Sequence, residues 1–587
     1  MASPPVLSRS TSWTSTSEPK DRDAFKDASS PALVESLCQD ENKKPVWQRP
    51  LSGNADKEYD TQRGMSERHI MMIAIGGTIG TGIFLSAGST VAMAGPASAL
   101  LSYFVVGLFC YGVVMILGEM AAYIPVSGTF SVYATRFVSP SMGFTLGWNY
   151  WLQWALTIPS ELIAAAVILQ YWTDKLKAWE WALIIIVPIF AMQLIHVRVY
   201  GESEYWFAMI KVIMVVVFII VGLIYNWGGV IGHPGPGLAN FHDGQAFIGG
   251  FSAFAQTFAL AFYSYGGVEL VSLAAGETKS PHKAIPRAIK ATFFRVVLFY
   301  ILTILTIGLN INHSDPSLLS AANNSDVTAS PLTTIFMRAG FGAAVHVVNA
   351  VLLTAVLSAT NSCFYASSRM LFSLARSGQA PAIFGWVNRR GVPVPALLIS
   401  LGISFLTFLT TIWGEGEVFT WFLNLVGISA LLVWGSIGII SLQFRRAWTA
   451  QGRHLSDLPY TQPLYPLLPC FVVILSVLMF AADGYASVIT QPFSVKNIIA
   501  TYLGVIFYAV LYIGYAIYEY FFLKPPHHFV PLREADLDTD AVWKKGEGDF
   551  IRQQERELKE KLEALEGEAH GMKRWMLRLR RINEHVY

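Results

Sequence analysis

The sequence predicts an all-α integral membrane protein with twelve transmembrane helices. Of its 587 residues, 53% are hydrophobic and only 14% are charged, which is far more apolar than a soluble globular protein. Twelve apolar stretches each reach the length of about 20 residues that crosses a bilayer. Their hydrophobicity is continuous rather than alternating, which excludes barrel strands. Helices then remain the only segments that satisfy every backbone polar group inside lipid.

The sequence divides into three regions. Residues 1–68 are polar, rich in Ser, Thr and Pro, and lack the apolar core of a secretory signal, so we expect a disordered cytoplasmic tail. Residues 69–523 form the membrane domain, and 524–587 form a polar cytoplasmic C-terminal tail. Its charged stretch from Ile551 predicts a helix, either solvated or resting on anionic lipid. The spans are expected near 70–89, 97–120, 145–171, 180–198, 205–226, 248–275, 291–311, 343–372, 395–413, 418–441, 466–487 and 498–522.

The basic residues of the short loops predict the orientation. With both termini in the cytoplasm, the inner loops hold most of these residues and the outer loops hold few, as the positive-inside rule requires. The inner ones are Arg136, Arg198, Lys279, Lys283, Arg287, Lys290, Arg376, Arg389, Arg390, Arg445, Arg446 and Arg453; the outer ones are Lys175, Lys177, Arg338 and Lys496.

Several classes of protein are excluded by composition and motifs. The net charge is +2, and no sustained basic run with interleaved aromatics is present, so we expect no nucleic acid partner. The four cysteines form no CxxC pair, which predicts neither a disulfide framework nor a metal site. The chain contains no HExxH or GxSxG motif, so we do not expect an enzyme.

The first apolar stretch contains an unusual cluster of glycines. It reads IAIGGTIGTGIF, with Gly76, Gly77, Gly80 and Gly82. Each glycine inside a helix costs about 0.5 to 1 kcal/mol relative to alanine. The cluster therefore either serves close helix packing or interrupts the helix. It lacks the Lys-Ser/Thr of a Walker motif and follows no strand, which excludes a nucleotide site.

The sixth stretch repeats this pattern five spans later. In FALAFYSYGGVELVSLAAGE, Gly266 and Gly267 lie in mid-segment and Glu269 follows, where lipid disfavours a charge. Two interrupted helices in corresponding positions predict an inverted five-helix repeat, spans 1–5 and 6–10 with helices 1 and 6 broken, plus spans 11 and 12. The exposed N–H groups would bind a carboxylate, and the freed carbonyls an ammonium group. Such a site suits a zwitterion, and hence an amino acid.

Two further spans carry polar stripes. One face of the third span is made of Asn149, Gln153, Thr157, Ser160 and Glu161, which recur at intervals of three and four. A stripe in the eighth span consists of Ser358, Asn361, Ser362, Tyr365 and Arg369. Substrate contact and interhelical hydrogen bonds both explain such stripes. Because a charge at a helix centre costs about 2.5 to 3.5 kcal/mol in lipid, Glu161 should face other helices or a cavity.

Three titratable residues near span ends have more than one interpretation. Lys211, in the fifth span, either snorkels toward the headgroups or is held inside the bundle, where desolvation would let it exchange protons. Glu119, in the second span, either forms an ion pair or handles protons. Glu277 is expected at the membrane boundary, paired with its chain neighbours.

Several long segments resemble a known family. They are IGGTIGTGIFLSAG; GEM (Gly118–Met120) with PVSGTF; TRFVSPSMGFTLGWNYW; GESEYWFAMIKV; GGVELVSLAAGETKSPHKAIPRAIK; and ATNSCFYASSRMLFSLAR. From about Arg68 to the end of the twelfth span, the chain is similar to the fungal amino acid permeases of the amino acid-polyamine-organocation superfamily. This resemblance implies the inverted repeat and plasma-membrane uptake of amino acids by proton symport, with the proton as coupling ion and no cofactor.

The resemblance also implies a set of site residues. The first break would hold the substrate carboxylate, Phe262 and Tyr263 would gate the site, and Lys211 would take the place that a sodium ion has in other transporters. The expected substrate-binding residues are Gly76, Gly77, Thr78, Ile79, Gly80, Thr81, Gly82, Gln153, Thr157, Glu161, Phe262, Tyr263, Ser264, Gly266, Gly267 and Glu269. Lys211 and Glu119 are the candidates for proton coupling.

The segments give a mixed indication of the substrate. AAGET and TNSCFYASSRMLF look like permeases for lysine and arginine, whereas PVSGTF and GWNYWLQW look like broad-range permeases. The carboxylate of Glu161 would pair with a cationic substrate side chain, so we expect cationic amino acids to be transported within a wider range of amino acids. A nutrient sensor of the same fold and an exchanger without proton coupling are the alternatives. The expected partners are the lipid bilayer and, for the tails, trafficking or ubiquitination machinery.

Overall fold

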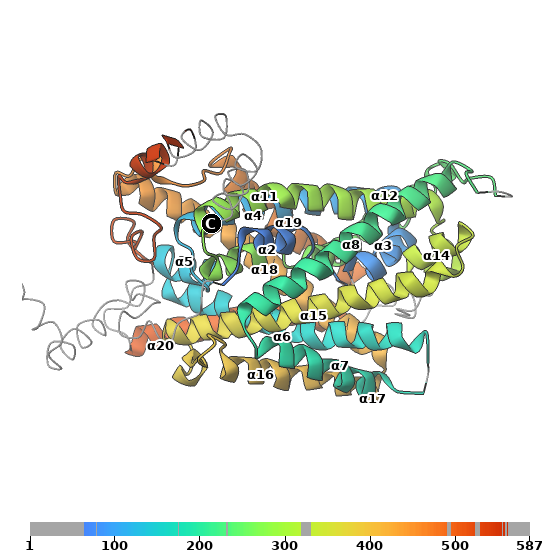
Figure 1. Ribbon diagram of the computed structural model, residues 1–587, viewed down its shortest axis with the longest axis horizontal. Helices are drawn as coiled ribbons and strands as arrows, with labels where there is room; N and C mark the ends of the chain where they lie inside the picture. Colours follow the sequence, from blue (N-terminus) through green and yellow to red (C-terminus); the bar gives the residue numbers. More distant parts are fainter. Residues whose placement is uncertain are drawn as a thin grey trace, which may run out of the picture.

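The computed structural model is almost entirely helical, which confirms the predicted all-α fold (Figure 1). It describes residues 64–560, apart from 78, 81, 174, 231–232, 319–329, 490–494, 523–528, 555 and 558–559. Most of the predicted N-terminal tail and most of the helix expected from Ile551 lie outside these residues. The long helices run mainly along the longest axis of the molecule (Figure 1).

The first apolar segment is broken in its middle, as predicted. It consists of α2 (Glu67–Met72), the π-helical turn η4 (Ile73–Gly77), a non-helical stretch at Ile79 and Gly80, the π-helical turn η5 (Gly82–Ser86) and α3 (Ala87–Ala94). Wide turns of this kind replace the regular hydrogen-bond ladder and are frequent at functional sites. The glycine cluster therefore interrupts the helix.

The sixth apolar segment is also broken where the sequence predicts it. α9 (Gly250–Tyr265) ends at Gly266, and the chain resumes as the short α10 (Leu270–Leu273) and the 3₁₀ turn η7 (Ala274–Glu277). Between them Gly267 has φ +84°, a conformation that side chains rarely adopt. A glycine is required at this position for the chain to turn.

The remaining segments complete the predicted set of twelve. Among the described residues, nine helical segments are long and apolar enough to cross a membrane, and two shorter apolar helices accompany them. The elements that form the segments after the first are α4 (Pro96–Tyr123), α6 (Pro140–Gln170), α7 (Ala178–Gln193), α8 (Val197–Asn226), α9 to η7, α11 (Pro281–Arg295) with η8 (Val296–Ile301) and α12 (Leu302–Asn310), α15 (Ala344–Arg376), α16 (Val394–Ser404) with η10 (Phe405–Leu409) and α17 (Thr410–Trp413), α18 (Glu415–Ala450), α19 (Leu467–Ile489) and α20 (Val495–Phe522).

The two five-helix units pack against each other in matching pairs. In the first pair, α3 and η5 lie against α9; in the second, α4 lies against α11; in the third, α6 runs along α15. A Cβ added to Gly82 would lie 2.4 Å from the Cα of Ser264, so the two helix breaks lie side by side. This pairing is the one expected of inverted repeats.

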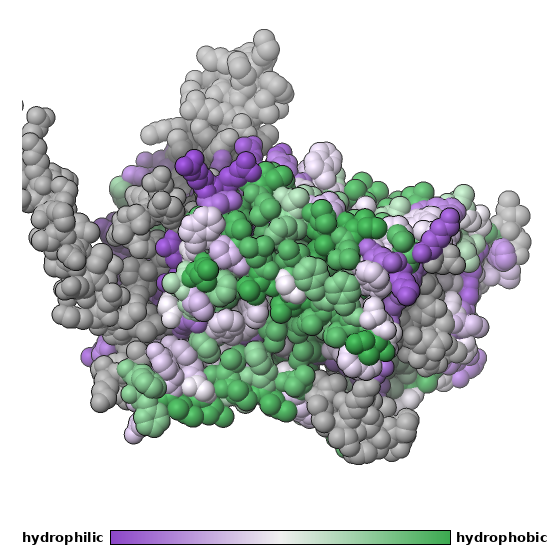
Figure 2. All heavy atoms as spheres, turned by 90° about the horizontal axis from the view of Figure 1, so that it is seen from below, coloured by the Kyte–Doolittle hydropathy of each residue, from purple (hydrophilic) through white to green (hydrophobic). Residues whose placement is uncertain are grey.

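The outside of the bundle is apolar. Figure 2 shows a broad apolar face with hydrophilic residues gathered toward its margins. One face of α8 exposes Ile213, Val217, Ile220 and Ile224, which are three and four residues apart. An apolar patch of this extent on a soluble monomer would be exceptional, so it fits a helix that faces lipid.

Part of the C-terminal tail packs on the bundle. Residues 529–551, here called the C-terminal strap, lie at the end of the bundle that the basic loops predict to be cytoplasmic (Figure 1). The Val542 N–H donates to the Tyr123 carbonyl at 2.9 Å. Arg136, which is buried, forms an ion pair with Asp540 at 2.6 Å. The strap therefore joins the second segment to the short helix α5 (Thr129–Phe137) that precedes the third.

We expect the substitution Trp543→Ala to release the C-terminal strap. The indole is 6% exposed, and its Nε1–H donates to the Asp457 carbonyl at 2.6 Å. Truncating a buried tryptophan costs about 3 to 5 kcal/mol, and short surface segments open locally at low cost. Limited proteolysis should therefore cleave the tail faster. Phe550→Ala, at a side chain that is 62% exposed, is the control. Equal cleavage rates of the two variants would contradict the role of Trp543 in holding the C-terminal strap on the bundle.

Candidate functional site

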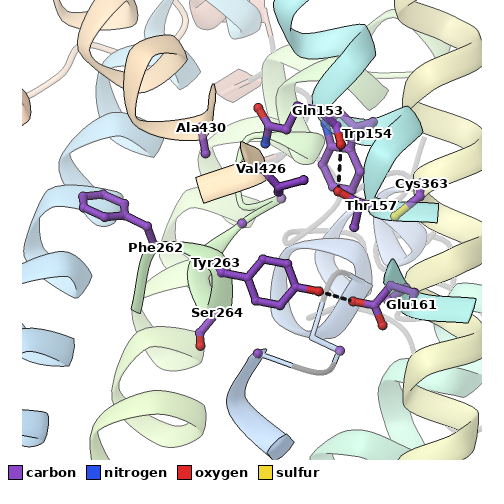
Figure 3. Close-up of a pocket in the computed structure, with 15 residues that line it drawn as sticks. Gln153, Trp154, Thr157, Glu161, Phe262, Tyr263, Ser264, Cys363, Val426 and Ala430 are labelled. Atoms are coloured by element: carbon purple, nitrogen blue, oxygen red, sulfur yellow. Dashed lines mark hydrogen bonds between the residues drawn. The ribbon is translucent and has the colours of Figure 1, made fainter. Parts of the chain in front are cut away.

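A small cavity lies between the two helix breaks (Figure 3). Its volume is about 40 Å³, which holds a few water molecules. An amino acid can enter only if the walls move apart. The lining residues are Gly80, Gly82, Gln153, Trp154, Thr157, Glu161, Phe262, Tyr263, Ser264, Gly266, Gly267, Ala359, Cys363, Val426 and Ala430.

Two glycines of the first break leave no space for a side chain. A Cβ on Gly80 would lie 2.9 Å from the Cβ of Ala359 and 3.0 Å from Oε1 of Glu161. A Cβ on Gly82 would lie 2.4 Å from the Cα of Ser264. Because both glycines are without side chains, the first break packs closely against its neighbours, and its backbone lines the cavity.

Glu161 and Tyr263 face each other across the cavity. The Tyr263 hydroxyl donates to Glu161 Oε1 at 3.1 Å and links α6 to α9 (Figure 3). Glu161 is 4% exposed. A buried carboxylate is stable only when it is hydrogen-bonded or paired with a cation. This wall of the cavity therefore favours a positively charged group.

Phe262 points away from Tyr263 and joins an aromatic cluster (Figure 3). Its ring centroid lies 5.6 Å from that of Phe109 and 5.7 Å from that of Trp434. The Trp434 indole donates to Glu269 Oε2 at 3.2 Å. Glu269 is 1% exposed and is not among the lining residues, so its contact with the substrate stays a prediction. Its carboxylate instead ties α18 to the second break.

The other predicted residues differ in how close they lie to the cavity. Gln153 and Thr157 line it, and the Thr157 hydroxyl donates to the Gln153 carbonyl at 2.8 Å. Ser264 shares a hydrogen bond of 2.8 Å with the hydroxyl of Tyr103. Outside the lining are Gly76, Gly77 and Ile79, and the predicted residues Thr78 and Thr81 lie outside the described part of the chain.

Lys211 is held inside the bundle and does not snorkel. Its side chain is completely buried. The ammonium group donates to the Gly76 carbonyl at 2.8 Å and to the Ser358 hydroxyl at 2.8 Å. The Gly76 carbonyl lies in the disrupted stretch before the first break, where helix carbonyls lose their partners. The cation of the fifth segment thus stabilises the broken first segment.

The polar stripe of α15 serves contacts between helices. The Ser358 hydroxyl donates to Glu204 on α8 at 2.7 Å, and the Asn361 amide donates to the same carboxylate at 3.1 Å. The part of α15 that lines the cavity is instead made of Ala359 and Cys363. Of the two interpretations of this stripe, interhelical bonding is the one that the structure supports.

Glu277 closes the bundle toward the end that is predicted to be cytoplasmic. Its carboxylate accepts from Arg369 Nε at 3.0 Å and from the Tyr365 hydroxyl at 2.8 Å. The Met65 N–H, just before α2, donates to its carbonyl at 3.1 Å. The expectation that Glu277 pairs with its chain neighbours is wrong, because Glu277 is fully buried and its carboxylate pairs with the buried guanidinium of Arg369 on α15.

Glu119 lies in an ion pair outside the cavity. Arg445 donates to its carboxylate through Nη2 at 2.6 Å and through Nε at 3.0 Å, and the Gln462 N–H donates at 2.9 Å. This is the ion-pair alternative for Glu119. Two guanidinium donors on one carboxylate form a bidentate, charge-assisted pair, which fixes the position of the Glu119 side chain.

Several residues that the structure brings to the site are not among the predicted ones. They are Trp154, Ala359, Cys363, Val426 and Ala430 in the lining, and Glu204 beside Lys211. The lining residues are small or apolar and look like any core position. Glu204 stands in the quoted segment GESEYWFAMIKV, seven residues before Lys211, and this spacing on one helix face was the available signal.

Comparisons with known proteins agree on one family. The amino acid permease family matches residues 69–524. A lysine-specific permease of Escherichia coli is 43% identical over 455 residues, which cover 77% of this chain and 93% of that protein. A general amino-acid permease of Saccharomyces cerevisiae is 37% identical over 515 residues, or 84% of each chain. A manganese transporter structure from Eremococcus coleocola has a TM-score of 0.49 at 13% identity, covering 77% of this chain and 93% of that one. The sequence matches, and not this structural likeness, carry the comparison.

Proposed function

This chain belongs to the amino acid permease family, and from that premise we propose that it imports amino acids across the plasma membrane by proton symport. Lysine and arginine are the favoured substrates within a wider range. The family match and the relatives, which are permeases rather than enzymes, make the chain a multi-pass transporter of amino acids. The coupling ion, the membrane and the substrate preference are the proposed part.

The observation that carries the proposal is the cavity between the two breaks. Gly80 and Gly82 present bare backbone on one side, and the end of α9 with the Gly266 turn lies on the other. Backbone N–H groups at the start of a half-helix attract a carboxylate, and freed carbonyls attract an ammonium group. An α-amino acid carries both groups on one carbon, so it fits a site that has both.

The preference for cationic amino acids is supported by Glu161. It is the carboxylate in the cavity lining, and its Oε1 accepts a neutral hydrogen bond from Tyr263. A lysine or guanidinium side chain would supply the charge-assisted hydrogen bond that this buried group favours. The lysine-specific relative at 43% identity is in line with this preference.

Alternating access is supported by the closed end of the bundle. The buried bonds from Arg369 and Tyr365 to Glu277 join α15 to the end of the sixth segment. The Met65 N–H joins the start of the first segment to the same residue. Release of substrate toward this end requires these bonds to open together, so the broken helices move as gates.

Lys211 is the proposed coupling residue because it bonds directly to the broken helix. With its proton, the ammonium makes a charge-assisted hydrogen bond to the Gly76 carbonyl. Without it, the neutral amine binds this carbonyl more weakly, and the first segment is freer to move. Protonation of one side chain is thereby linked to the position of a gate.

Uptake of radiolabelled lysine at varied external pH tests this coupling. Wild-type uptake should rise as the external medium is acidified, because protons then drive symport, and Lys211→Met should flatten the profile. The control is Lys290→Met, at an exposed residue of α11. A flat wild-type profile would favour the exchanger, and an unchanged profile in Lys211→Met would assign coupling to another group.

A further inference from the structure

A second buried charge lies on the same helix as Lys211. Glu204 is completely buried in α8, seven residues before Lys211, and both project from one helix face. Its carboxylate accepts from Ser358 at 2.7 Å and from Asn361 at 3.1 Å. No role in substrate binding follows for Glu204, because it does not line the cavity.

Ser358 joins the two charged groups into one hydrogen-bonded chain. The Lys211 ammonium donates to the Ser358 oxygen at 2.8 Å, and the Ser358 hydroxyl donates to Glu204 Oε2 at 2.7 Å. All three side chains are fully buried. The two distances are those of good hydrogen bonds, and the donors point in one direction along the chain. A proton therefore has a continuous path between the amine and the carboxylate.

The path leads toward the end of the bundle that the basic loops predict to be cytoplasmic. α8 begins at Val197, and its second residue is Arg198, one of the basic residues that predict the cytoplasmic end. Glu204 is seven residues closer to that end than Lys211, which is about 10 Å along a helix. Lys211 contacts the first break, whereas Glu204 lies on the exit side. The hydrogen-bonded chain therefore runs from the first break toward the predicted cytoplasmic end.

The charges around the pair favour transfer between its members. Lys211 is attracted by Glu204 and by Glu161 on α6, and it is repelled by Arg295 on α11. Around Glu204 the other titratable groups are Tyr200 on α8 and Cys363 on α15. A buried charge without its counter-charge is costly, so loss of the ammonium charge is best matched by neutralising Glu204 at the same time.

We propose that Glu204 receives the coupling proton from Lys211 through Ser358 and releases it toward the cytoplasm. An ammonium N–H proton moves to the Ser358 oxygen while the hydroxyl proton of Ser358 moves to Glu204 Oε2. The products are a neutral amine, an intact hydroxyl and a carboxylic acid, so no net charge is created. This inference rests on the proposed proton coupling, and it assigns Glu204 as the exit group for the proton.

The test compares two activities of purified protein in liposomes. Exchange of radiolabelled lysine at equal pH needs no net proton release, whereas accumulation driven by a pH gradient does. In Glu204→Gln, the exchange rate should stay within about twofold of the wild-type rate. Gradient-driven accumulation should fall at least tenfold. Ser358→Ala, which removes only the bridging hydroxyl, should show the same selective loss, and Ser358→Thr should restore accumulation.

The control is Glu417→Gln, at an exposed acidic residue near the start of α18. It should behave as wild type in both assays. Gradient-driven accumulation at the wild-type level in Glu204→Gln would overturn the inference, as would an equal loss of exchange and accumulation in Ser358→Ala. If the wild-type protein itself shows no gradient-driven accumulation, the proposed symport fails, which is a distinct result.

Discussion

Replacing Gly82 with alanine is expected to abolish amino acid uptake. The added Cβ would lie 2.4 Å from the Cα of Ser264, a backbone atom that cannot rotate away. The two breaks would have to separate, which would displace the backbone N–H groups that are proposed to bind the substrate carboxylate. Each lost hydrogen bond to a charged group costs about 1.5 to 3 kcal/mol, so losing two lowers affinity by about a hundredfold or more.

Uptake of radiolabelled lysine, corrected for protein at the cell surface, measures this effect. The matched control is Gly402→Ala, because Gly402 lies in α16 with nothing within 4 Å of an added Cβ. That variant should transport normally. Normal uptake by Gly82→Ala at an equal surface level would show that the substrate does not contact this backbone.

The second large effect is a change of specificity in Glu161→Gln. Glutamine has the same shape and keeps an oxygen to accept the bond from Tyr263, so the cavity should stay intact. The carboxylate charge is lost, and with it the charge-assisted bond to a cationic side chain. Lysine uptake should fall about ten- to a hundredfold, while uptake of neutral amino acids changes little.

Competition by a panel of common amino acids measures this shift. The control is Glu417→Gln, an exposed acidic residue at the start of α18, which tests whether any loss of negative charge weakens lysine uptake. An equal loss of lysine and leucine uptake in Glu161→Gln would remove Glu161 from substrate recognition and leave it with a role in the fold.

The helix breaks could be predicted because their signal is local. A glycine cluster weakens a helix wherever it occurs, and two clusters five spans apart restrict the fold to an inverted repeat. The third-segment stripe was similarly informative, since Gln153, Thr157 and Glu161 share one face and all line the cavity. In these cases spacing along one helix was sufficient.

The remaining features depend on packing between helices. On α15 the polar side chains at Ser358 and Asn361 mark one face, but the cavity meets the adjacent face with Ala359 and Cys363. The rotation of a helix about its axis is set by its neighbours, so composition alone does not reveal it. The depth of Lys211 was undetermined for the same reason. Burial of that lysine is explained by the Gly76 carbonyl and the Ser358 hydroxyl, which accept hydrogen bonds from its ammonium group.

The C-terminal strap illustrates a different limit. Its sequence is polar overall, and a few apolar residues such as Trp543 and Leu537 are buried against the bundle. Mean composition hides such anchors, because a short segment needs few of them. The sequence therefore predicts a polar tail but does not indicate which of its residues pack against the membrane domain.

A structure of the protein with bound lysine tests the central claim most directly. We expect the α-carboxylate within hydrogen-bond distance of backbone N–H groups at residues 79–82. The α-ammonium group should lie among the carbonyls that end α9, and the side chain should extend toward Glu161. Lysine bound away from both breaks, or bound while both segments wind into continuous helices, would contradict the account.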